Sequence, residues 1–188
     1  KSTLLRILLG FEMPIEGSVC FDGQDLTGLD SMSVRRQIGV VLQSGVVNSG
    51  SLFENIAGSS RVTLDQAWEA ARAAGLAADI EQMPMGMHTV ISEGCTNLSD
   101  RQRQRVLIAR SLVLKPKILL MDEATSALDN QTQTIVTDSL DRMNATRIVV
   151  AHRLSTIRNA DRIYVVEAGI VVQSGTFDEL VNQEGLFA

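Results

Sequence analysis

Apolar residues recur along this chain with two different spacings. Short runs rich in Val, Ile and Leu predict buried strands, because such runs between turn residues fit a strand that is covered on both faces. Apolar residues three or four positions apart, behind a capping residue, predict helices. The predicted strands are residues 18–21, 38–42, 117–122, 147–151, 162–167 and 170–174. The helices predicted outside the middle of the chain are residues 2–10, 31–36 and 130–143 and a short one capped by Thr176.

The middle of the chain, from Ser51 to about Leu114, is predicted to be mostly helical. Residues 63–66 form a capping box before an Ala-rich helix, Gly75 interrupts that helix, and Pro84 ends the next one. Strands alternate with helices on both sides of this segment. We therefore expect an α/β fold with a mainly parallel sheet and a helical insertion of roughly 60 residues.

Polar residues directly follow three of the predicted strands. Asp122 and Glu123 stand at the end of residues 117–122, while Gln43 and His152 follow the strands that end at 42 and 151. In open α/β sheets, ligands bind at the carboxyl ends of the strands. A buried strand that ends in Asp-Glu can give one carboxylate to Mg²⁺ and the next to a water molecule, as cleavage of a phosphoanhydride requires.

The first residues, Lys1-Ser2-Thr3, match the end of the phosphate-binding pattern G-x-x-x-x-G-K-[ST] and precede an apolar helical face. Lys1 would neutralise the β- and γ-phosphates of ATP, and Ser2 would bind Mg²⁺ together with Asp122. The chain opens inside this motif. We expect it to be a fragment that lacks the N-terminal strand and the glycine loop.

The other polar residues at the strand ends would complete the active site of an ATPase. Gln43 would reach the metal and the attacking water. Glu123 would polarise that water as general base, and His152 would contact the γ-phosphate. These three residues are the predicted catalytic residues, and Ser2, Gln43 and Asp122 are the predicted metal ligands.

Composition narrows the class of protein without deciding it. The chain has 188 residues, enough for one domain, and its net charge of −5 without any Lys/Arg run argues against nucleic acid as the main partner. Cys20 and Cys95 are too few for a disulfide framework, which favours a reducing compartment. Apolar runs fall short of the roughly 18–20 residues of a membrane span.

Taken together, these residues resemble the nucleotide-binding domain of an exporter-type ABC transporter, and the likeness covers essentially the whole chain. Residues 52–60 and 83–93 are most similar to the ATPase parts of peptide exporters of the bacteriocin (NHLM leader) type. The segments that carry the family likeness are Lys1-Ser2-Thr3, the loop at Gln43, Leu98-Ser99 with residues 102–105, Asp122-Glu123, residues 126–129 and His152.

The resemblance implies a P-loop NTPase fold of the RecA-like type. Residues 1–44 and 115–188 would form its core, and residues 45–114 would form the helical subdomain with the signature segment. The implied location is the cytoplasmic face of the plasma (inner) membrane, beneath transmembrane domains that choose the cargo.

The resemblance also implies a head-to-tail dimer of two such domains. ATP would be bound by Lys1-Ser2-Thr3 and Asp122 of one chain and by Ser99 and Gln102 in the signature of the other, with Asp129 in the adjoining loop. ATP closes such a dimer, and hydrolysis releases it.

The signature departs from the family pattern Leu-Ser-Gly-Gly-Gln, because Asp100 and Arg101 replace the two glycines. A carboxylate about 5 Å from a phosphate costs of order 3 kcal/mol at an effective dielectric near 20, or roughly a hundredfold in affinity. Arg101 would offset part of this cost if its side chain turned inward. We expect a signature that closes poorly over ATP, and hence a heterodimer whose partner has an ordinary Gly-Gly signature.

Two other functions fit parts of the sequence. The altered signature also suits a non-hydrolysing or regulatory ATP-binding subunit. A soluble ABC ATPase of DNA repair or translation is the other alternative, although the long coiled-coil insertion or second cassette typical of those proteins does not appear in this sequence. His88 and the methionines at 83, 85 and 87 could form a soft-metal site, although methionines that fill the core are the simpler interpretation. The transported substrate does not follow from this sequence.

Overall fold

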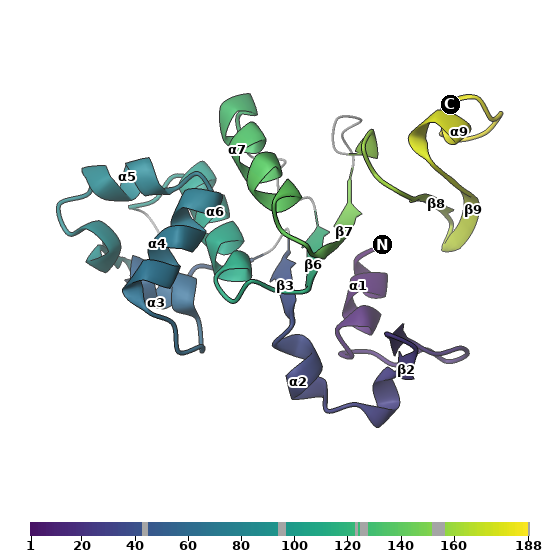
Figure 1. The fold of residues 1–188 in the computed structure, drawn as a ribbon, viewed down its shortest axis with the longest axis horizontal. Helices are drawn as coiled ribbons and strands as arrows, with labels where there is room; N and C mark the ends of the chain where they lie inside the picture. The colour runs from purple at the N-terminus through teal and green to yellow at the C-terminus, as the bar shows by residue number, and fades with distance from the viewer. Residues whose placement is uncertain (43–44, 94–96, 123, 125–127, 152–156, 188) are drawn as a thin grey trace. The chain divides into compact units, whose positions relative to one another are not determined.

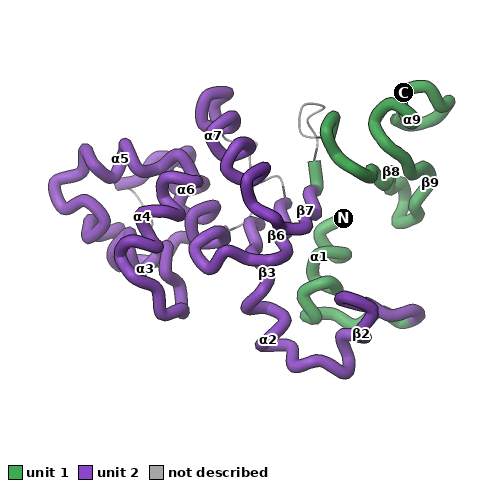
Figure 2. The backbone as a smooth tube through the Cα atoms, viewed as in Figure 1, with its two compact units in different colours: residues 1–15, 150–188 green, residues 16–149 purple. Residues whose placement is uncertain are grey.

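A computed structural model of the chain describes residues 1–42, 45–93, 97–122, 124, 128–151 and 157–187 (Figure 1). The chain forms two compact units, one made of residues 1–15 and 150–188 and the other of residues 16–149 (Figure 2). The predicted strand–helix alternation is present in the larger unit. The subdomain boundaries expected at 44/45 and 114/115 stay a prediction.

A three-stranded sheet in the order β3-β6-β7 stands at the centre of the larger unit. It consists of β3 (Ile38–Val41), β6 (Ile118–Asp122) and β7 (Thr146–Val150). β3 and β6 run parallel, with Ile38 opposite Ile118 and Val41 opposite Met121. The predicted parallel pairing of these apolar strands is therefore confirmed, and four of the five residues of β6 are buried.

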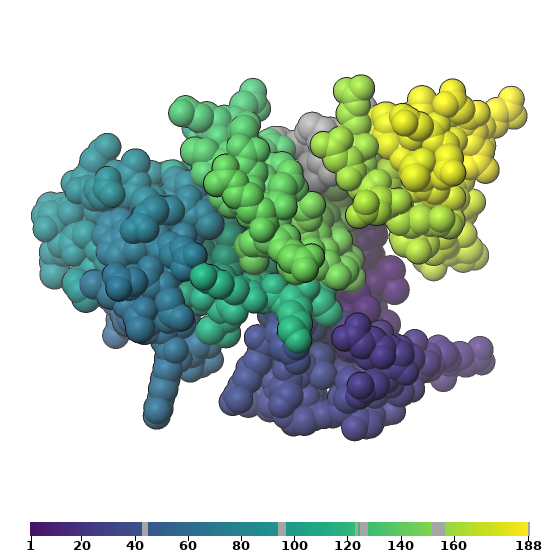
Figure 3. Space-filling model, viewed as in Figure 1, coloured from purple at the N-terminus to yellow at the C-terminus, as the bar shows by residue number. Residues whose placement is uncertain are grey.

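Four helices of the middle segment pack together beside this sheet. They are α3 (Leu52–Ala57), α4 (Leu64–Ala73), α5 (Ala77–Gln82) and α6 (Asp100–Leu112). α6 contacts α3, α4 and β3 and so connects the helical segment to the sheet. In the space-filling view residues 52–93 and 97–112, in blue to green-teal, lie together in one body (Figure 3).

Three of these helices, α3, α4 and α6, begin with a capping box formed by their own sequence. The capping box predicted at Thr63 and Gln66 is present, and two further boxes join Ser51 to Glu54 and Ser99 to Gln102. In each, the hydroxyl accepts from the backbone N–H three residues on, and that residue's side chain accepts from the N-cap N–H, so two otherwise unpaired donors are satisfied.

One element of the middle segment was not predicted. β4 (Gly50–Ser51) and β5 (Val90–Ile91) pair antiparallel, with Gly50 opposite Ile91. Strands of two residues are too short to show an alternating pattern, and their pairing depends on segments about 40 residues apart in the chain. The segment is therefore helical with one small sheet rather than helical throughout.

The core of the larger unit is continuous from the sheet into the helices. Trp68 and Met83 pack against it, and Met87 is 2% exposed, whereas Met85 is 59% exposed. Core filling is thus confirmed for two of the three methionines. The largest fully buried side chains of this core are Leu52, Ile56, Leu76, Ile80, Ile91, Ile108, Leu119, Val41, Val106 and Val136.

Some of the other elements of the larger unit agree with the predictions, but the strand Gln24–Asp25 and the 3₁₀ turns were not predicted, and the strand predicted at 18–21 is limited to Cys20–Phe21. Asp30 caps α2 by accepting from the N–H of Ser33, as expected. The remaining elements are β1 (Cys20–Phe21), β2 (Gln24–Asp25), the 3₁₀ turns Leu26–Gly28 and Gly86–His88, α2 (Ser31–Arg35) and α7 (Asn130–Asp141).

The smaller unit contains α1 (Ser2–Leu8), the hairpin β8–β9 (Ile163–Glu167 and Ile170–Gly175) and α9 (Phe177–Val181). The predicted turn of the hairpin is present, with positive φ of 48° at Ala168 and 84° at Gly169, as a two-residue turn of this kind requires. Thr176 caps α9 through a capping box with Glu179. In the part of the chain that the structure describes, no helix has the length and apolar character needed to cross a bilayer.

Candidate nucleotide-binding site

The carboxylate of Asp122 lies at the end of the buried strand β6 and is itself buried, with the residue 6% exposed. β3, its parallel neighbour, ends at Val41, two residues before Gln43. β7, its neighbour on the other side, ends at Val150, two residues before His152. The strands that lead into the three predicted polar positions are therefore adjacent in one sheet. Gln43, Glu123 and His152 themselves lie outside the described residues.

The chemistry of Asp122 suits a magnesium ion. Mg²⁺ is bound in phosphate-processing sites by one or two carboxylates, water and the phosphates themselves rather than by a cage of protein ligands. The described residues contain no group of three or more His, Cys, Asp or Glu that could hold a metal. The buried carboxylate of Asp122 is a ligand of the kind that fits Mg²⁺ bound with a nucleotide. The Ser2 hydroxyl and the Gln43 amide stay predicted ligands.

Lys1, Ser2 and Thr3 stand at the start of α1 in the smaller unit and are exposed. Lys1 is the N-cap of α1, and its side chain makes no capping hydrogen bond. The sequence prediction of a helix directly behind Lys1 is thus confirmed, although it ends at Leu8 rather than at residue 10.

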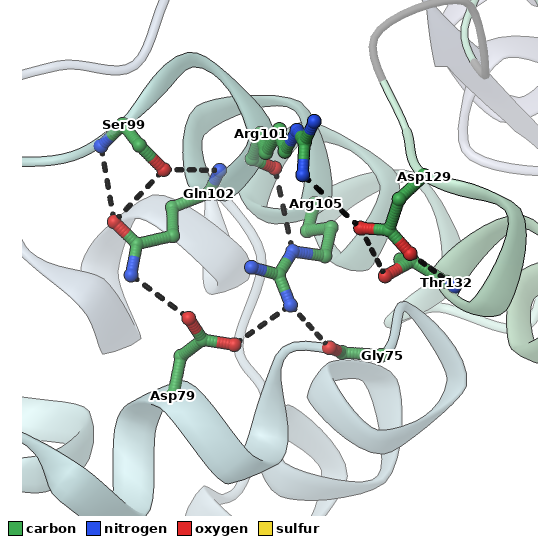
Figure 4. Close-up of polar contacts among 8 residues, drawn as sticks. All are labelled: Gly75, Asp79, Ser99, Arg101, Gln102, Arg105, Asp129 and Thr132. Atoms are coloured by element: carbon green, nitrogen blue, oxygen red, sulfur yellow. Dashed lines mark hydrogen bonds and ion pairs between the residues drawn. The ribbon is translucent and has the colours of Figure 1, made fainter.

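The signature segment opens α6, and its two polar side chains cap that helix (Figure 4). Ser99 Oγ accepts from the N–H of Gln102 at 3.2 Å, and Gln102 Oε1 accepts from the N–H of Ser99 at 3.0 Å. Gln102 Nε2 also donates to Asp79 Oδ1 of α5 at 2.9 Å. Both residues predicted to contact the partner's nucleotide are therefore held in place by bonds within the chain.

Asp79 joins the signature helix to α5 from the other side as well. Arg105 Nη1 donates to Asp79 Oδ2 at 2.7 Å and to the carbonyl of Gly75 at 2.6 Å (Figure 4). The Arg105–Asp79 pair is mostly buried, with side-chain exposures of 13% and 27%. This pair holds the first two turns of α6 against the rest of the helical segment.

The two residues that depart from the family signature are both engaged in ion pairs. Asp100 has an exposed side chain and pairs with Arg103, one turn along α6. Arg101 turns toward Asp129, with Nη1 3.7 Å from Oδ2 (Figure 4). Because Arg103 accompanies the Asp100 carboxylate, the repulsion of a phosphate is smaller than the isolated charge implies. The poor closure predicted for this signature stays a prediction.

Asp129 is the N-cap of α7 and also faces the signature helix. Its Oδ1 accepts from the N–H of Thr132 at 2.9 Å, and its Oδ2 accepts from Thr132 Oγ1 at 3.1 Å. The pKa of Asp129 is lowered chiefly by the hydrogen bond from the Thr132 N–H and, to a smaller extent, by the positive charge of Arg101. Asp129 is therefore an ionised helix cap near neutral pH, and it links the loop after Asp122-Glu123 to Arg101.

Two residues of α6 that the sequence analysis gave no role contact the motif segments. Gln104 Nε2 donates to the carbonyl of Ala124 at 2.7 Å. Arg110 donates to the carbonyls of Asn55 at 2.6 Å and Val46 at 3.0 Å, and to Asn55 Oδ1 at 2.9 Å. Helical spacing places both residues on α6, but the backbone groups they reach are set by tertiary packing and leave no local signal in the sequence.

Known proteins resemble this chain over its whole length. The family model described as ABC transporter matches residues 1–126. The chain is 44% identical over 187 residues to the Alpha-hemolysin translocation ATP-binding protein HlyB of Escherichia coli O157:H7, covering 98% of this chain and 26% of that protein. It is 45% identical over 192 residues to the Leukotoxin translocation ATP-binding protein LktB of Mannheimia haemolytica, covering 100% of this chain and 27% of that protein.

A solved structure described as a bacterial Atm1-family ABC exporter with ATP bound matches with a TM-score of 0.92 and 38% identity, over 100% of this chain and 33% of that one. The chain thus spans about a quarter of the length of its curated relatives. The likeness extends across both compact units and shows the P-loop NTPase fold predicted from the sequence. This chain belongs to the ABC transporter family, as the ATP-binding domain of an exporter-type member.

Proposed function

We propose that this domain binds and hydrolyses ATP with Mg²⁺ and thereby drives export by an ABC transporter. The observation that carries the proposal is the buried carboxylate of Asp122 at the end of β6, with β3 and β7 on either side leading to Gln43 and His152. Membership of the ABC transporter family supports the same chemistry. Export is supported by relatives whose names describe translocation.

In this proposal the residues divide between binding and the chemical step. Lys1 and Thr3 bind the phosphates, and Ser2, Gln43 and Asp122 would hold Mg²⁺, which when bound neutralises phosphate charge. Glu123 accepts a proton from the attacking water as general base, and His152 donates a hydrogen bond to the γ-phosphate.

We propose that two domains act as a head-to-tail dimer at the cytoplasmic face of a membrane, joined to transmembrane domains. Ser99 and Gln102 then meet the nucleotide bound by the partner chain. Support comes from their position at the N-terminus of a 13-residue helix, whose dipole favours an anion.

The proposal that the dimer is a heterodimer has less support. That support is the replacement of the two family glycines by Asp100 and Arg101. In a heterodimer, this signature would bind ATP more weakly than the signature of the partner chain. The ion pair between Asp100 and Arg103 reduces that argument, because it leaves less uncompensated negative charge. Purification of the natural assembly decides between a second copy of this chain and a distinct ABC partner.

For the cargo we propose a polypeptide. Relatives at 44% and 45% identity are named for translocation of alpha-hemolysin and leukotoxin. The bacteriocin-type peptide suggested by residues 52–60 and 83–93 is the narrower form of this proposal. Export assays with a co-encoded peptide or protein would distinguish a bacteriocin-type peptide cargo from a larger polypeptide cargo.

Mg-dependent ATP hydrolysis by the protein as encoded tests the proposed function. We expect Asp122→Asn to lower turnover by about a hundredfold or more, because a metal ion contributes several kcal/mol of charge stabilisation. Asp138→Asn is the matched control, since Asp138 is an exposed carboxylate on α7, and it should leave turnover unchanged. ATP binding without turnover in the unmodified protein would instead show a non-hydrolysing regulatory subunit.

A further inference from the structure

One helix, α6, carries the signature segment and also forms hydrogen bonds to residues that follow two other predicted motif positions. Its N-terminus is the signature segment, which begins at Ser99. In the second turn, Gln104 reaches the carbonyl of Ala124, the residue after Glu123. Near the C-terminus, Arg110 reaches Val46 and Asn55 in the segment that follows Gln43.

The bond from Gln104 is the contact nearest to the predicted chemistry. Its length of 2.7 Å is short for an N–H···O bond. Ala124 is 1% exposed, so water has little access to replace the donor. Loss of the amide would leave the Ala124 carbonyl without this partner, and a buried carbonyl without a donor is unfavourable. Without the Gln104 donor, we expect the backbone at Ala124 to shift.

The position of this bond matters more than its strength. Ala124 is covalently joined to Glu123, so a shift of the peptide at 124 changes where the Glu123 carboxylate is presented. Misplacement of a catalytic group by about 1 Å can lower the rate roughly a hundredfold. The donor side of the bond is on α6, two residues beyond Gln102 and on the same rigid helix as the signature.

We propose that Gln104 is a positioning residue for ATP hydrolysis: it holds the backbone at Ala124, the residue that directly follows the predicted general base Glu123 in the sequence. The inference rests on the proposed function, in which Glu123 is the general base.

Gln104→Met tests this assignment, because methionine has nearly the length of glutamine and lacks a donor. Gln104→Lys restores a donor on a flexible side chain. The matched control is Gln37→Met, since Gln37 Nε2 likewise donates to a backbone carbonyl, that of Ser33 at 3.2 Å, at an exposed place away from the sheet edge. All variants are made in the full protein as encoded, with thermal unfolding measured for each.

We expect Gln104→Met to lower kcat for Mg-ATP by about 10- to 100-fold with little change in KM, since it displaces the base without touching the bound nucleotide. Gln104→Lys should recover a measurable part of kcat, and Gln37→Met should match the unmodified protein. A purely structural role would instead lower thermal stability and leave the kcat of the folded protein unchanged, and that result would overturn the inference.

Hydrogen–deuterium exchange of the peptide spanning residues 119–131 gives a readout that does not depend on turnover. Exchange there should be faster in Gln104→Met than in Gln37→Met. Equal exchange in the two variants would overturn the inference even if the protein is an active ATPase. Absence of turnover in the unmodified protein would contradict the proposed function, while the exchange comparison would still decide whether Gln104 holds this backbone.

Discussion

Arg110 illustrates how a single charged side chain fixes a loop in this domain. Its guanidinium is half-buried, and burial lowers its pKa from the usual value. The side chain donates to two backbone carbonyls and to Asn55 Oδ1, and Asn55 in turn donates to the carbonyls of Asn48 and Ser51. Arg110 and Asn55 together satisfy the backbone of the segment between Gln43 and α3.

Arg110→Met is therefore expected to destabilise the domain by about 3 kcal/mol, because it leaves carbonyls in that segment without their charged donor. The comparison is Lys115→Met, which removes an exposed ion pair with Glu69 and should change stability by about 0.5 kcal/mol or less. Urea unfolding of both variants measures the difference. Equal losses would show that the Arg110 network contributes no more than a surface pair.

At the residue scale, the sequence predicted the functional residues better than it predicted their hydrogen-bond partners. Asp122 at the end of a buried strand was predicted from local pattern, and the structure places it so. The helix start at Ser99 was implied by the family resemblance, and the cap at Asp129 was not predicted. The bonds from Gln102 to Asp79 and from Gln104 to Ala124 join residues 23 and 20 positions apart. No periodicity or capping rule specifies such partners, because tertiary packing selects them.

At the scale of elements, β3 and α6 lie close together at Gly39. Gly39 lies in β3, and a Cβ at this position would be 2.4 Å from the carbonyl oxygen of Ser111 on α6. It would also be 2.9 Å from Leu119 Cδ1 and from Pro116 Cγ. The lack of a side chain at Gly39 thus allows α6 to lie directly against the sheet that ends at the site.

Gly39→Ala should destabilise the domain by about 1–3 kcal/mol, because backbone atoms of α6 have to shift to admit a methyl group. Gly28→Ala is the control, since a Cβ there would meet nothing within 4 Å, and its effect should stay within about 0.5 kcal/mol. Thermal or urea unfolding of the two variants gives the comparison. A neutral Gly39→Ala would mean that β3 and α6 are not tightly packed.

Most elements could be predicted because each has a strong local signal. Thr63, Ser99 and Thr176 begin capping boxes, and the apolar runs of β3 and β6 have turn residues at their ends. Boundaries differed by a residue or two, as at α1 and α7, where the last residues of the apolar pattern lie past the end of the helix. The paired strands β4 and β5 were missed, because two residues cannot carry a period.

At the scale of the whole molecule, the account depends on a dimer that brings this signature to another chain's nucleotide. The signature differs from the family pattern at Asp100 and Arg101, and both side chains are in ion pairs with other residues of this chain. Closure of the dimer over ATP would have to accommodate both side chains where the family pattern has none.

We expect the double variant Asp100→Gly with Arg101→Gly to strengthen ATP-driven dimer formation by about tenfold. This is less than the roughly hundredfold expected from an isolated carboxylate at an effective dielectric near 20, since Arg103 offsets part of the charge. Light scattering with and without Mg-ATP, in the Glu123→Gln background that slows hydrolysis, measures the dimer. Weaker dimers in the double variant would show that Asp100 and Arg101 favour closure.

Mg-ATP turnover by the protein as encoded, alone and with any co-encoded ABC partner, tests the central claim most directly. Glu123→Gln is compared with the unmodified chain in each case. The account predicts turnover that is lost in Glu123→Gln while ATP binding is kept. Undiminished turnover in Glu123→Gln, or ATP binding without turnover in the unmodified protein under both conditions, would contradict it.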